Sequence, residues 1–176
     1  ASMSEAERNN TLVIFIGDNG TTREVIQTPY SKLKAKSTVY QGGVAVPMVI
    51  SGSGVSRKGE RETALINSTD LFATIADVAG AGSTQINDSK SIRPLFIQTQ
   101  TNFREFVYNE LKGNGKDYWT VRNTKYKLIE YATGSKELYD LSSDPYENTN
   151  LLQSTLTPEQ IAAKLALETE IARIRQ

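Results

Sequence analysis

The sequence predicts an α/β fold that combines a mainly parallel sheet with a small C-terminal antiparallel sheet and a helix. Residues 12–16 are apolar in unbroken order, which is typical of a strand buried on both faces. From residue 102 onward, short aromatic or β-branched runs alternate with turn residues, which indicates an antiparallel meander. The stretch Thr157–Gln176 begins with a helix start signal.

Composition and charge describe a folded chain without bulk attraction to polyanions. Of the 176 residues, 38% are hydrophobic and 23% are charged, which is typical of a globular protein. Lys and Arg together number 20, as do Asp and Glu, so no basic excess favours nucleic acid as a partner. No apolar run has the length that crosses a membrane, so no membrane partner is expected.

Two residue types that serve many enzymes, cysteine and histidine, are absent from the sequence. The absence of cysteine excludes disulfides, thiolate metal sites and thiol nucleophiles within these residues. The absence of histidine excludes a Ser-His-Asp triad and a histidine acid or base. Many common enzyme designs are therefore excluded for this chain.

The first candidate site follows the apolar run of residues 12–16. Ligands of parallel α/β sheets bind just outside the carboxyl ends of the strands, where Asp18 and Asn19 are found. Both side chains offer oxygen atoms, which suit a hard cation such as Ca²⁺. The alternative is a plain turn, because an isolated Asp-Asn-Gly after a strand most often has that role.

The second candidate site is the segment KSTVYQGGVAVP at residues 36–47. Lys36 supplies a point charge for an anion, and Gly42-Gly43 lets the chain turn closely. A solvated lysine and an ordinary glycine loop remain the alternatives when each feature is taken alone.

The next predicted element is a helix over residues 68–80. Ser68 or Thr69 can cap it, and Gly80 ends it. Asp70 is interpreted as a structural or capping residue and not as a catalyst. The apolar side chains expected to form one face of the helix are Leu71, Ile75, Val78 and Ala79.

The C-terminal part of the sequence predicts about four antiparallel strands. Asn114-Gly115 and Thr133-Gly134 are the expected hairpin turns. The expected strands are Glu105–Leu111, Tyr118–Arg122, Tyr126–Glu130 and Glu137–Asp140.

The last segment predicts a capped helix that packs on a sheet. Thr157 caps this helix, and Gln160 completes a capping box. Its partial apolar stripe consists of Leu167, Ile171 and Ile174. The carboxylates before it are interpreted as local hydrogen-bonding groups, with a metal site as the alternative: Asp140, Asp144 and Glu147.

These motifs, in this order, resemble the sulfatase family of the alkaline phosphatase superfamily. The strand that ends in DNG and the K-x-T-x-Y-x-G-G-x-x-V-P segment carry the resemblance first, and STDLFATIADVAG, WTVRNTKYKLI and ELYDLSSDPYENTNL continue it. The resemblance implies an alkaline-phosphatase-like sandwich with a mainly parallel sheet, plus a small C-terminal antiparallel sheet with a helix. Residues 1–100 would then be the C-terminal part of the large α/β domain, and residues 101–176 a small C-terminal subdomain.

The resemblance also implies roles for the candidate residues. Asp18 and Asn19 match ligands of a Ca²⁺ ion, and Lys36 matches a lysine that contacts the substrate sulfate. The sequence departs from the family at Gln41, where the family usually has Glu, and at Ala73, where it usually has Pro. The glutamine removes a charge but keeps the hydrogen-bonding shape.

The implied activity is hydrolysis of sulfate esters by a formylglycine nucleophile with Ca²⁺. Formylglycine is made from Cys or Ser in a C/S-x-P-x-R motif, which this chain lacks. We therefore expect the C-terminal part of a longer sulfatase, with no catalytic residue of its own and with the N-terminal part as its partner. The alternatives are a phosphonate monoester hydrolase or phosphodiesterase of the same superfamily, and a non-catalytic module that keeps the fold.

Separation from that N-terminal part is expected to expose a sheet edge. A central strand at residues 12–16 would have neighbours outside this chain, so self-association through the open edge is expected. The resemblance allows a periplasmic, secreted or lysosomal location and selects none of them.

We predict that the purified 176-residue chain does not hydrolyse a chromogenic aryl sulfate. Ca²⁺ takes about 6–8 oxygen ligands, so Asp18 and Asn19 alone should hold it weakly. The measurement is chromophore release at several Ca²⁺ concentrations, compared with a protein-free blank. Turnover above the blank would show that the chain is a complete catalyst.

Overall fold

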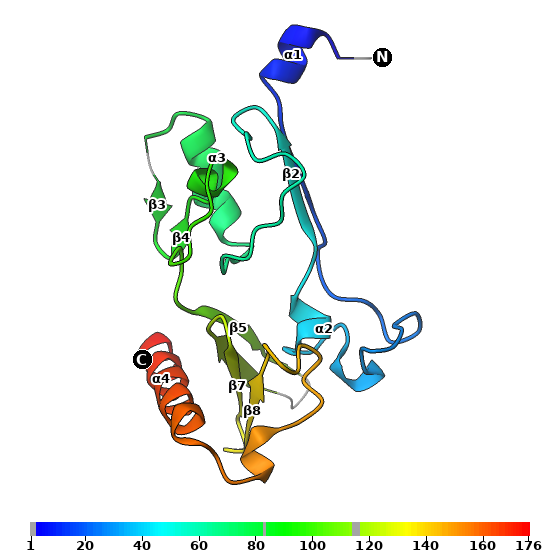
Figure 1. The fold of residues 1–176 in the computed structure, drawn as a ribbon, viewed down its shortest axis with the longest axis vertical. Helices are drawn as coiled ribbons and strands as arrows, with labels where there is room; N and C mark the ends of the chain where they lie inside the picture. The colour runs from blue at the N-terminus through cyan, green and yellow to red at the C-terminus, as the bar shows by residue number, and fades with distance from the viewer. Residues whose placement is uncertain (1–2, 83, 114–116) are drawn as a thin grey trace. The chain divides into compact units, whose positions relative to one another are not determined.

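A computed structural model describes residues 3–82, 84–113 and 117–176, which form two compact units (Figure 1). Unit 1 consists of Ala1–Ile16 and Met48–Arg104, and unit 2 of Gly17–Pro47 and Glu105–Gln176. The segment Gly17–Pro47 thus groups with the C-terminal residues. The predicted domain boundary at residue 100 concerns the longer protein and stays a prediction.

Unit 1 contains two small antiparallel sheets, β1 with β2 and β3 with β4. Its core is formed by residues 92–103 with one face of β1 and β2. Its elements are α1 (Glu5–Asn9), β1 (Leu12–Ile16), β2 (Met48–Gly52), α3 (Asp70–Val78), β3 (Gln85–Ile86), β4 (Ser89–Lys90) and the 3₁₀ helix η2 (Arg93–Phe96).

The structure corrects the predicted environment of the strand Leu12–Ile16. This strand pairs antiparallel with β2 and has no parallel neighbour among the described strands. Leu12 packs on the core of unit 1, whereas Val13 and Phe15 are 55% and 64% exposed. The physical reason is alternation: successive side chains of a strand point to opposite faces, and the described part of the chain covers one face.

Helix α3 also differs from its prediction, because its buried face is small and polar. Asp70, Ala73 and Thr74 are buried, whereas Ile75, expected on the apolar face, is 60% exposed. Ala73 donates its backbone N–H to Ser89 Oγ at 2.9 Å. Proline, the usual family residue at position 73, has no N–H to donate, so this departure adds a hydrogen bond.

Asp70 is confirmed as a structural residue. Its carboxylate is 1% exposed and forms an ion pair with Arg104. It also accepts the backbone N–H groups of Asn67 at 2.7 Å and Lys90 at 2.9 Å. One buried side chain therefore fastens the start of α3 to β4 and to the end of unit 1.

Unit 2 is built on a four-stranded antiparallel sheet in the order β5-β6-β7-β8, as predicted. The turn at Thr133-Gly134 is present, with Gly134 at φ +87°. The turn predicted at Asn114-Gly115 lies outside the described residues. The elements are η1 (Lys32–Lys34), α2 (Gln41–Val44), β5 (Val107–Leu111), β6 (Tyr118–Arg122), β7 (Tyr126–Tyr131), β8 (Lys136–Asp140), η3 (Leu151–Gln153) and α4 (Pro158–Ile174).

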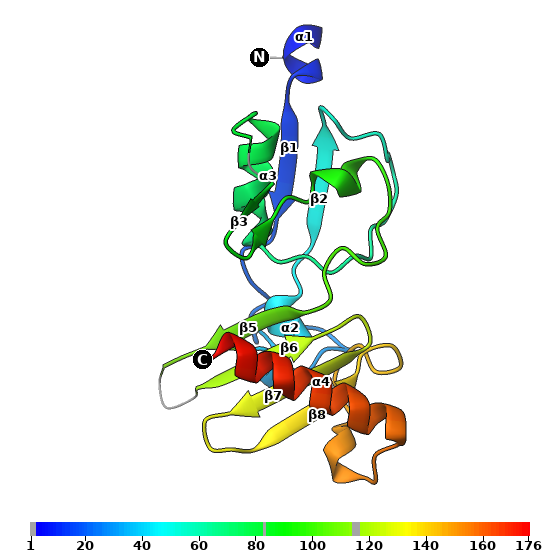
Figure 2. The ribbon, with the colours of Figure 1, turned by 90° about the vertical axis from the view of Figure 1, so that its left-hand side faces the viewer.

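The sheet of unit 2 is covered on both faces. Helix α4 lies across one face (Figure 2), where it packs around Leu128. On the other face, Val39 from the segment 17–47 packs around Ile129. The alternation of β7 explains why these neighbouring residues serve different cores. The sheet and its two cores therefore hold the segment 17–47 in place.

Helix α4 begins as predicted, with a reciprocal capping box between Thr157 and Gln160. Its buried residues, Leu167 and Ile171, contact the sheet, which confirms the predicted packing. Among the helices that the structure describes, none combines the length and apolar character needed to span a bilayer.

We predict that Asp70→Asn destabilises unit 1. The amide cannot neutralise the Arg104 guanidinium, and it presents an N–H₂ group where a backbone N–H needs an acceptor. The free energy of unfolding should fall by about 2 kcal/mol, as measured by urea titration followed by circular dichroism. Asp88→Asn changes an exposed carboxylate of the same unit and should cost less than about 0.5 kcal/mol. Equal costs would exclude the fastening role of Asp70.

Candidate functional site

The two predicted motifs meet in unit 2. The Gly17 N–H donates to Pro47 O, and the Gly20 N–H donates to Gly43 O, both at 3.0 Å. These bonds attach both ends of the Asp-Asn-Gly turn to the segment 36–47. The structure therefore brings the candidate cation ligands and the candidate anion-binding segment together in one unit.

The glycines of both motifs are needed for this close approach. A Cβ on Gly20 would lie 2.0 Å from Gly42 O, far closer than the 3.0 Å below which a Cβ and a non-bonded atom essentially never approach. A Cβ on Gly43 would lie 2.2 Å from Thr38 O, and one on Gly42 would lie 2.3 Å from Lys34 O. The glycines thus allow backbone to pack on backbone, which is a more specific role than loop flexibility.

Asp18 and Asn19 are exposed, and neither side chain has a hydrogen-bond or ion-pair partner within the described ranges. Their oxygen atoms are free to bind a ligand and are of the kind that Ca²⁺ prefers. The residues that the structure describes contain no cluster of three or more His, Cys, Asp or Glu able to hold a metal ion. The donor chemistry therefore fits Ca²⁺ in type but supplies part of a shell, and the metal role stays a prediction.

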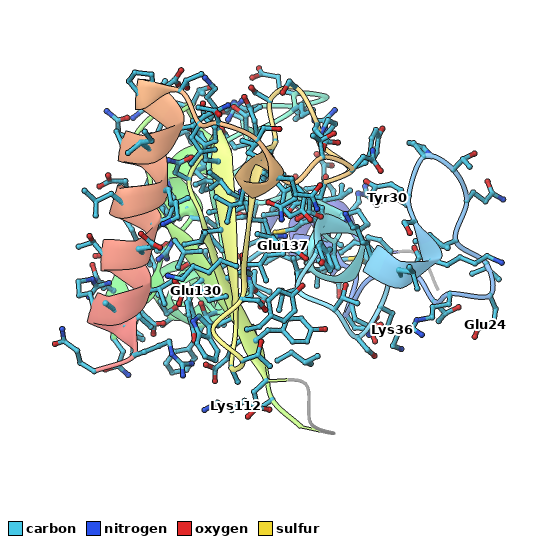
Figure 3. All side chains as sticks on the ribbon, turned by 90° about the horizontal axis from the view of Figure 1, so that it is seen from below. Glu24, Tyr30, Lys36, Lys112, Glu130 and Glu137 are labelled. Atoms are coloured by element: carbon cyan, nitrogen blue, oxygen red, sulfur yellow. The ribbon has the colours of Figure 1, made fainter. Side chains whose placement is uncertain are left out.

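Lys36 is exposed, and its side chain has no partner among the residues described. Its backbone is well fixed, since its N–H donates to Thr21 O at 2.9 Å. Ser37 has a positive φ of 65°, and Thr38 Oγ1 donates to Ala35 O at 2.6 Å. Lys36 lies on the side of unit 2 opposite α4 (Figure 3). The ammonium group is thus an available cation on a constrained turn.

Two buried residues, neither of which was predicted to belong to the candidate site, hold this turn to the sheet. Lys127 and Glu147 form an ion pair at 2.6 Å, with each side chain 1% exposed. Lys127 Nζ also donates to Val39 O, and Glu147 Oε2 accepts the N–H of Gln41, each at 2.6 Å. The prediction that Glu147 bonds locally is wrong, because its partners are distant in the sequence.

The other two carboxylates of that predicted group bond locally, as expected. Asp140 accepts the backbone N–H and the hydroxyl of Ser142. Asp144 accepts the N–H of Thr149 at 2.7 Å and a side-chain N–H of Asn148 at 3.3 Å. These contacts account for both side chains as turn residues.

The sequence holds one signal for this ion pair, which is the position of Lys127 within the otherwise apolar part of a strand. Burial lowers the pKa of Lys127 to about 8, against the opposing effect of Glu147. A lysine inside the otherwise apolar part of β7 requires a buried acceptor or counter-charge, since an unpaired buried ammonium is very costly. The sequence therefore shows that a partner is needed, but it does not show which carboxylate provides it.

Gln41, the departure from the family pattern, lies beside this ion pair. Its Oε1 atom is 3.5 Å from Lys127 Nζ. The amide leaves Glu147 as the carboxylate that pairs with Lys127 in the described chain. A glutamate at position 41 would place a second negative charge next to Glu147.

Tyr40 lies between Val39 and Gln41, the two residues whose backbone the ion pair binds, and it belongs to a cluster of tyrosines. Glu137 accepts hydrogen bonds from Tyr40 at 2.6 Å and Tyr139 at 2.7 Å, and the hydroxyls of Tyr40 and Tyr131 are 2.8 Å apart. Burial is the main cause that raises the pKa of Tyr40 and Tyr139 above the ordinary range, and it raises the pKa of Tyr131 to about 12. These phenols therefore stay neutral hydrogen-bond donors at physiological pH.

A comparison with protein families finds one family model that matches most of the chain. The model describes the C-terminal part of N-sulphoglucosamine sulphohydrolase and matches residues 32–176. The matched range includes Lys36, Lys127 and Glu147, and it begins after Asp18 and Asn19.

Curated relatives agree with this match. A sulfatase of Formosa agariphila is 33% identical over 90% of this chain and 31% of its own length. Human arylsulfatase A is 32% identical over 90% of this chain and 37% of its own length. The chain thus spans about a third of the length of these relatives.

A solved structure confirms the fold class. BT4656, in complex with its substrate D-glucosamine-2-N,6-O-disulfate, superposes with a TM-score of 0.74 at 20% identity. The superposition covers 92% of this chain and 34% of that protein. At this level of identity, the likeness shows that the two proteins share a fold.

We predict that Gly20→Ala separates the two motifs. The added Cβ meets the rigid backbone at Gly42, so the bond from Gly20 to Gly43 should break. Amide hydrogen exchange at residue 20, which donates this bond, should rise by about tenfold or more, the equivalent of at least about 1.4 kcal/mol. Gly17→Ala is the matched control, because its Cβ would meet only side-chain atoms at 3.3 Å. Similar protection in both variants would show that the close approach is dispensable.

Proposed function

Because this chain belongs to the family of N-sulphoglucosamine sulphohydrolase C-terminal segments, we propose that it acts as part of a longer sulfatase that hydrolyses sulfate esters. The single observation that supports this function most is the meeting of the two motifs in unit 2. Lys36, an exposed cation with no side-chain partner among the described residues, belongs to the same unit as two exposed oxygen donors, Asp18 and Asn19. A sulfate ester needs positive charge around its sulfuryl oxygens, which these groups can bind or recruit.

In this proposal, Lys36 binds the sulfate group of the substrate. Its ammonium is a compact charge with three N–H donors, which suits a sulfuryl oxygen. Because the turn around Lys36 is fixed before the substrate arrives, little reorganisation opposes the reaction. Preorganised charge of this kind is often a large contribution to catalysis.

Asp18 and Asn19 are proposed as two of the ligands of a Ca²⁺ ion. Bound Ca²⁺ would add positive charge beside the sulfuryl oxygens. Asp18 contributes a negative charge to the ion, whereas Asn19 contributes a neutral oxygen. Further ligands and the formylglycine nucleophile are assigned to the N-terminal part of the longer protein, and no residue of this chain is proposed as the nucleophile.

The apolar surface of unit 1 supports the proposal that further protein covers it. Val49 on β2 and Phe72 on α3 are 60% and 63% exposed, in addition to the exposed residues of β1. Exposed apolar residues in such number usually mark a protein–protein contact. We propose the N-terminal part of the longer protein as the natural partner, with self-association as the consequence when the chain is alone.

We predict different losses from Asp18→Ala and Lys36→Ala in the longer protein. Asp18→Ala should weaken Ca²⁺ binding and lower the activity together, because a charged ligand is lost. Lys36→Ala should leave Ca²⁺ binding nearly unchanged and lower kcat by about 10²–10³-fold, like the loss of one oxyanion-stabilising donor. Lys36→Arg should restore activity only in part, since a planar guanidinium places its charge differently.

The measurements are calorimetric Ca²⁺ titration and steady-state kinetics with a chromogenic aryl sulfate. Lys32→Ala removes another exposed lysine of the same segment and should leave both unchanged. Near-normal activity of Lys36→Ala, or unchanged Ca²⁺ affinity of Asp18→Ala, would remove that residue from the site. A preference for a chromogenic phosphonate monoester would favour the related hydrolase, and no turnover of either ester would favour a binding module.

A further inference from the structure

The buried ion pair between Lys127 and Glu147 bonds the backbone at two points of the segment 36–47, which we call the Lys36 segment. Lys127 Nζ donates to Val39 O, and Glu147 Oε2 accepts the N–H of Gln41, each at 2.6 Å. Both charged side chains are 1% exposed, so water competes little for these bonds. The path of the chain just after Lys36 is therefore tied to two buried charges, one on strand β7 and one in the loop that follows β8.

A third contact fixes the segment just before Lys36. Lys34 Nζ donates to the backbone oxygen of Glu147 and lies 4.9 Å from the ring centres of Tyr40 and Tyr139. The turn that carries Lys36 is thus anchored on both sides to the same face of the sheet. Glu137, which binds the tyrosine cluster, lies between α4 and the Lys36 side of the unit in Figure 3.

Stability alone is a poor explanation for the buried pair. The desolvation of two charges offsets most of their attraction, and apolar residues of similar volume are often equally stable. Apolar side chains cannot, however, bond Val39 O and the Gln41 N–H. The distinctive effect of Lys127 and Glu147 is therefore to fix the backbone of this one segment.

We propose that Lys127 and Glu147 position the ammonium group of Lys36 for an anionic sulfuryl group. This inference rests on the proposed role of Lys36 in sulfate binding. Neither buried residue touches the substrate in this proposal. They act through the backbone of residues 39–41, so both are positioning residues.

The test is a double-mutant cycle of Glu147→Gln and Lys36→Ala in the longer sulfatase, with a chromogenic aryl sulfate. Glu147→Gln keeps the size of the side chain but removes the charge that Lys127 pairs with. In the Lys36 protein, kcat should fall by about 10- to 100-fold, since a displacement of about 1 Å can cost about 10²-fold. In the Lys36→Ala background, the further loss should be less than about twofold, because Glu147 then has no ammonium to position.

Lys136→Met is the matched control within unit 2. Lys136 bridges Glu130 and Glu168 at 2.6 and 2.7 Å, and Glu168 belongs to α4. This variant weakens the same unit without touching the Lys36 segment. Any loss of activity should therefore be the same with and without Lys36→Ala.

Amide hydrogen exchange of the 176-residue chain gives a second readout that is independent of activity. Glu147→Gln should speed exchange at residues 36–43 by about tenfold or more while the amides of β6 and β7 keep their protection. Lys136→Met should not speed amide exchange at residues 36–43 more than elsewhere in unit 2. If Glu147→Gln fails to fold, the apolar pair Lys127→Met with Glu147→Leu replaces it, since it leaves no unpaired buried charge.

The outcomes separate this inference from the proposed function. Equal losses from Glu147→Gln in both backgrounds, or faster exchange throughout unit 2, would show a general structural role and overturn the inference alone. No loss from Lys36→Ala itself would overturn the proposed sulfate-binding role, and the inference with it. Both proposals are supported if Glu147→Gln lowers kcat only in the protein that retains Lys36 and speeds amide exchange only at residues 36–43.

Discussion

The candidate site depends on the ion pair between Lys127 and Glu147. Two charges withdrawn from water are stable only when their hydrogen-bonding groups find good partners. Here those partners include the backbone groups of Val39 and Gln41. A shift of residues 39–41 would leave these buried charges without hydrogen-bond partners. Because that loss is costly, the backbone of residues 39–41 is held in one conformation. The buried ion pair thus fixes the position of the exposed Lys36 through the backbone, without contacting the Lys36 side chain.

The two units differ in how completely they cover their sheets. In unit 2, α4 and the segment 17–47 cover opposite faces of four strands, so every candidate residue belongs to a closed scaffold. In unit 1, the described chain covers one face of β1 and β2 and leaves Phe15 exposed on the other. This contrast supports a division of roles in which unit 2 presents the site and unit 1 contacts further protein.

Sequence inspection located the two motifs of the candidate site because their signals are local, and the binding roles of their residues stay predictions. The Asp-Asn-Gly turn and the glycine pair were recognised from their own residues, and the structure joins them through Gly20 and Gly43. The role of Glu147 was missed, because its partners lie on β7 and at the start of α2. Its own neighbourhood, a turn rich in Asp and Asn, favoured local hydrogen bonds. Pairing between distant charges leaves no periodic trace in the sequence.

The sequence by itself determined the four strands of unit 2, the capped helix α4 and the order of motifs that marks the family. These features are set by alternation, capping and turn chemistry, which act over a few residues. The tertiary structure alone decided which face of β1 and α3 is buried, and which carboxylate pairs with Lys127. Burial depends on what packs against an element, and Ile75 shows that an apolar residue on a predicted apolar face can remain exposed. Such choices follow from contacts between distant segments, which local patterns do not encode.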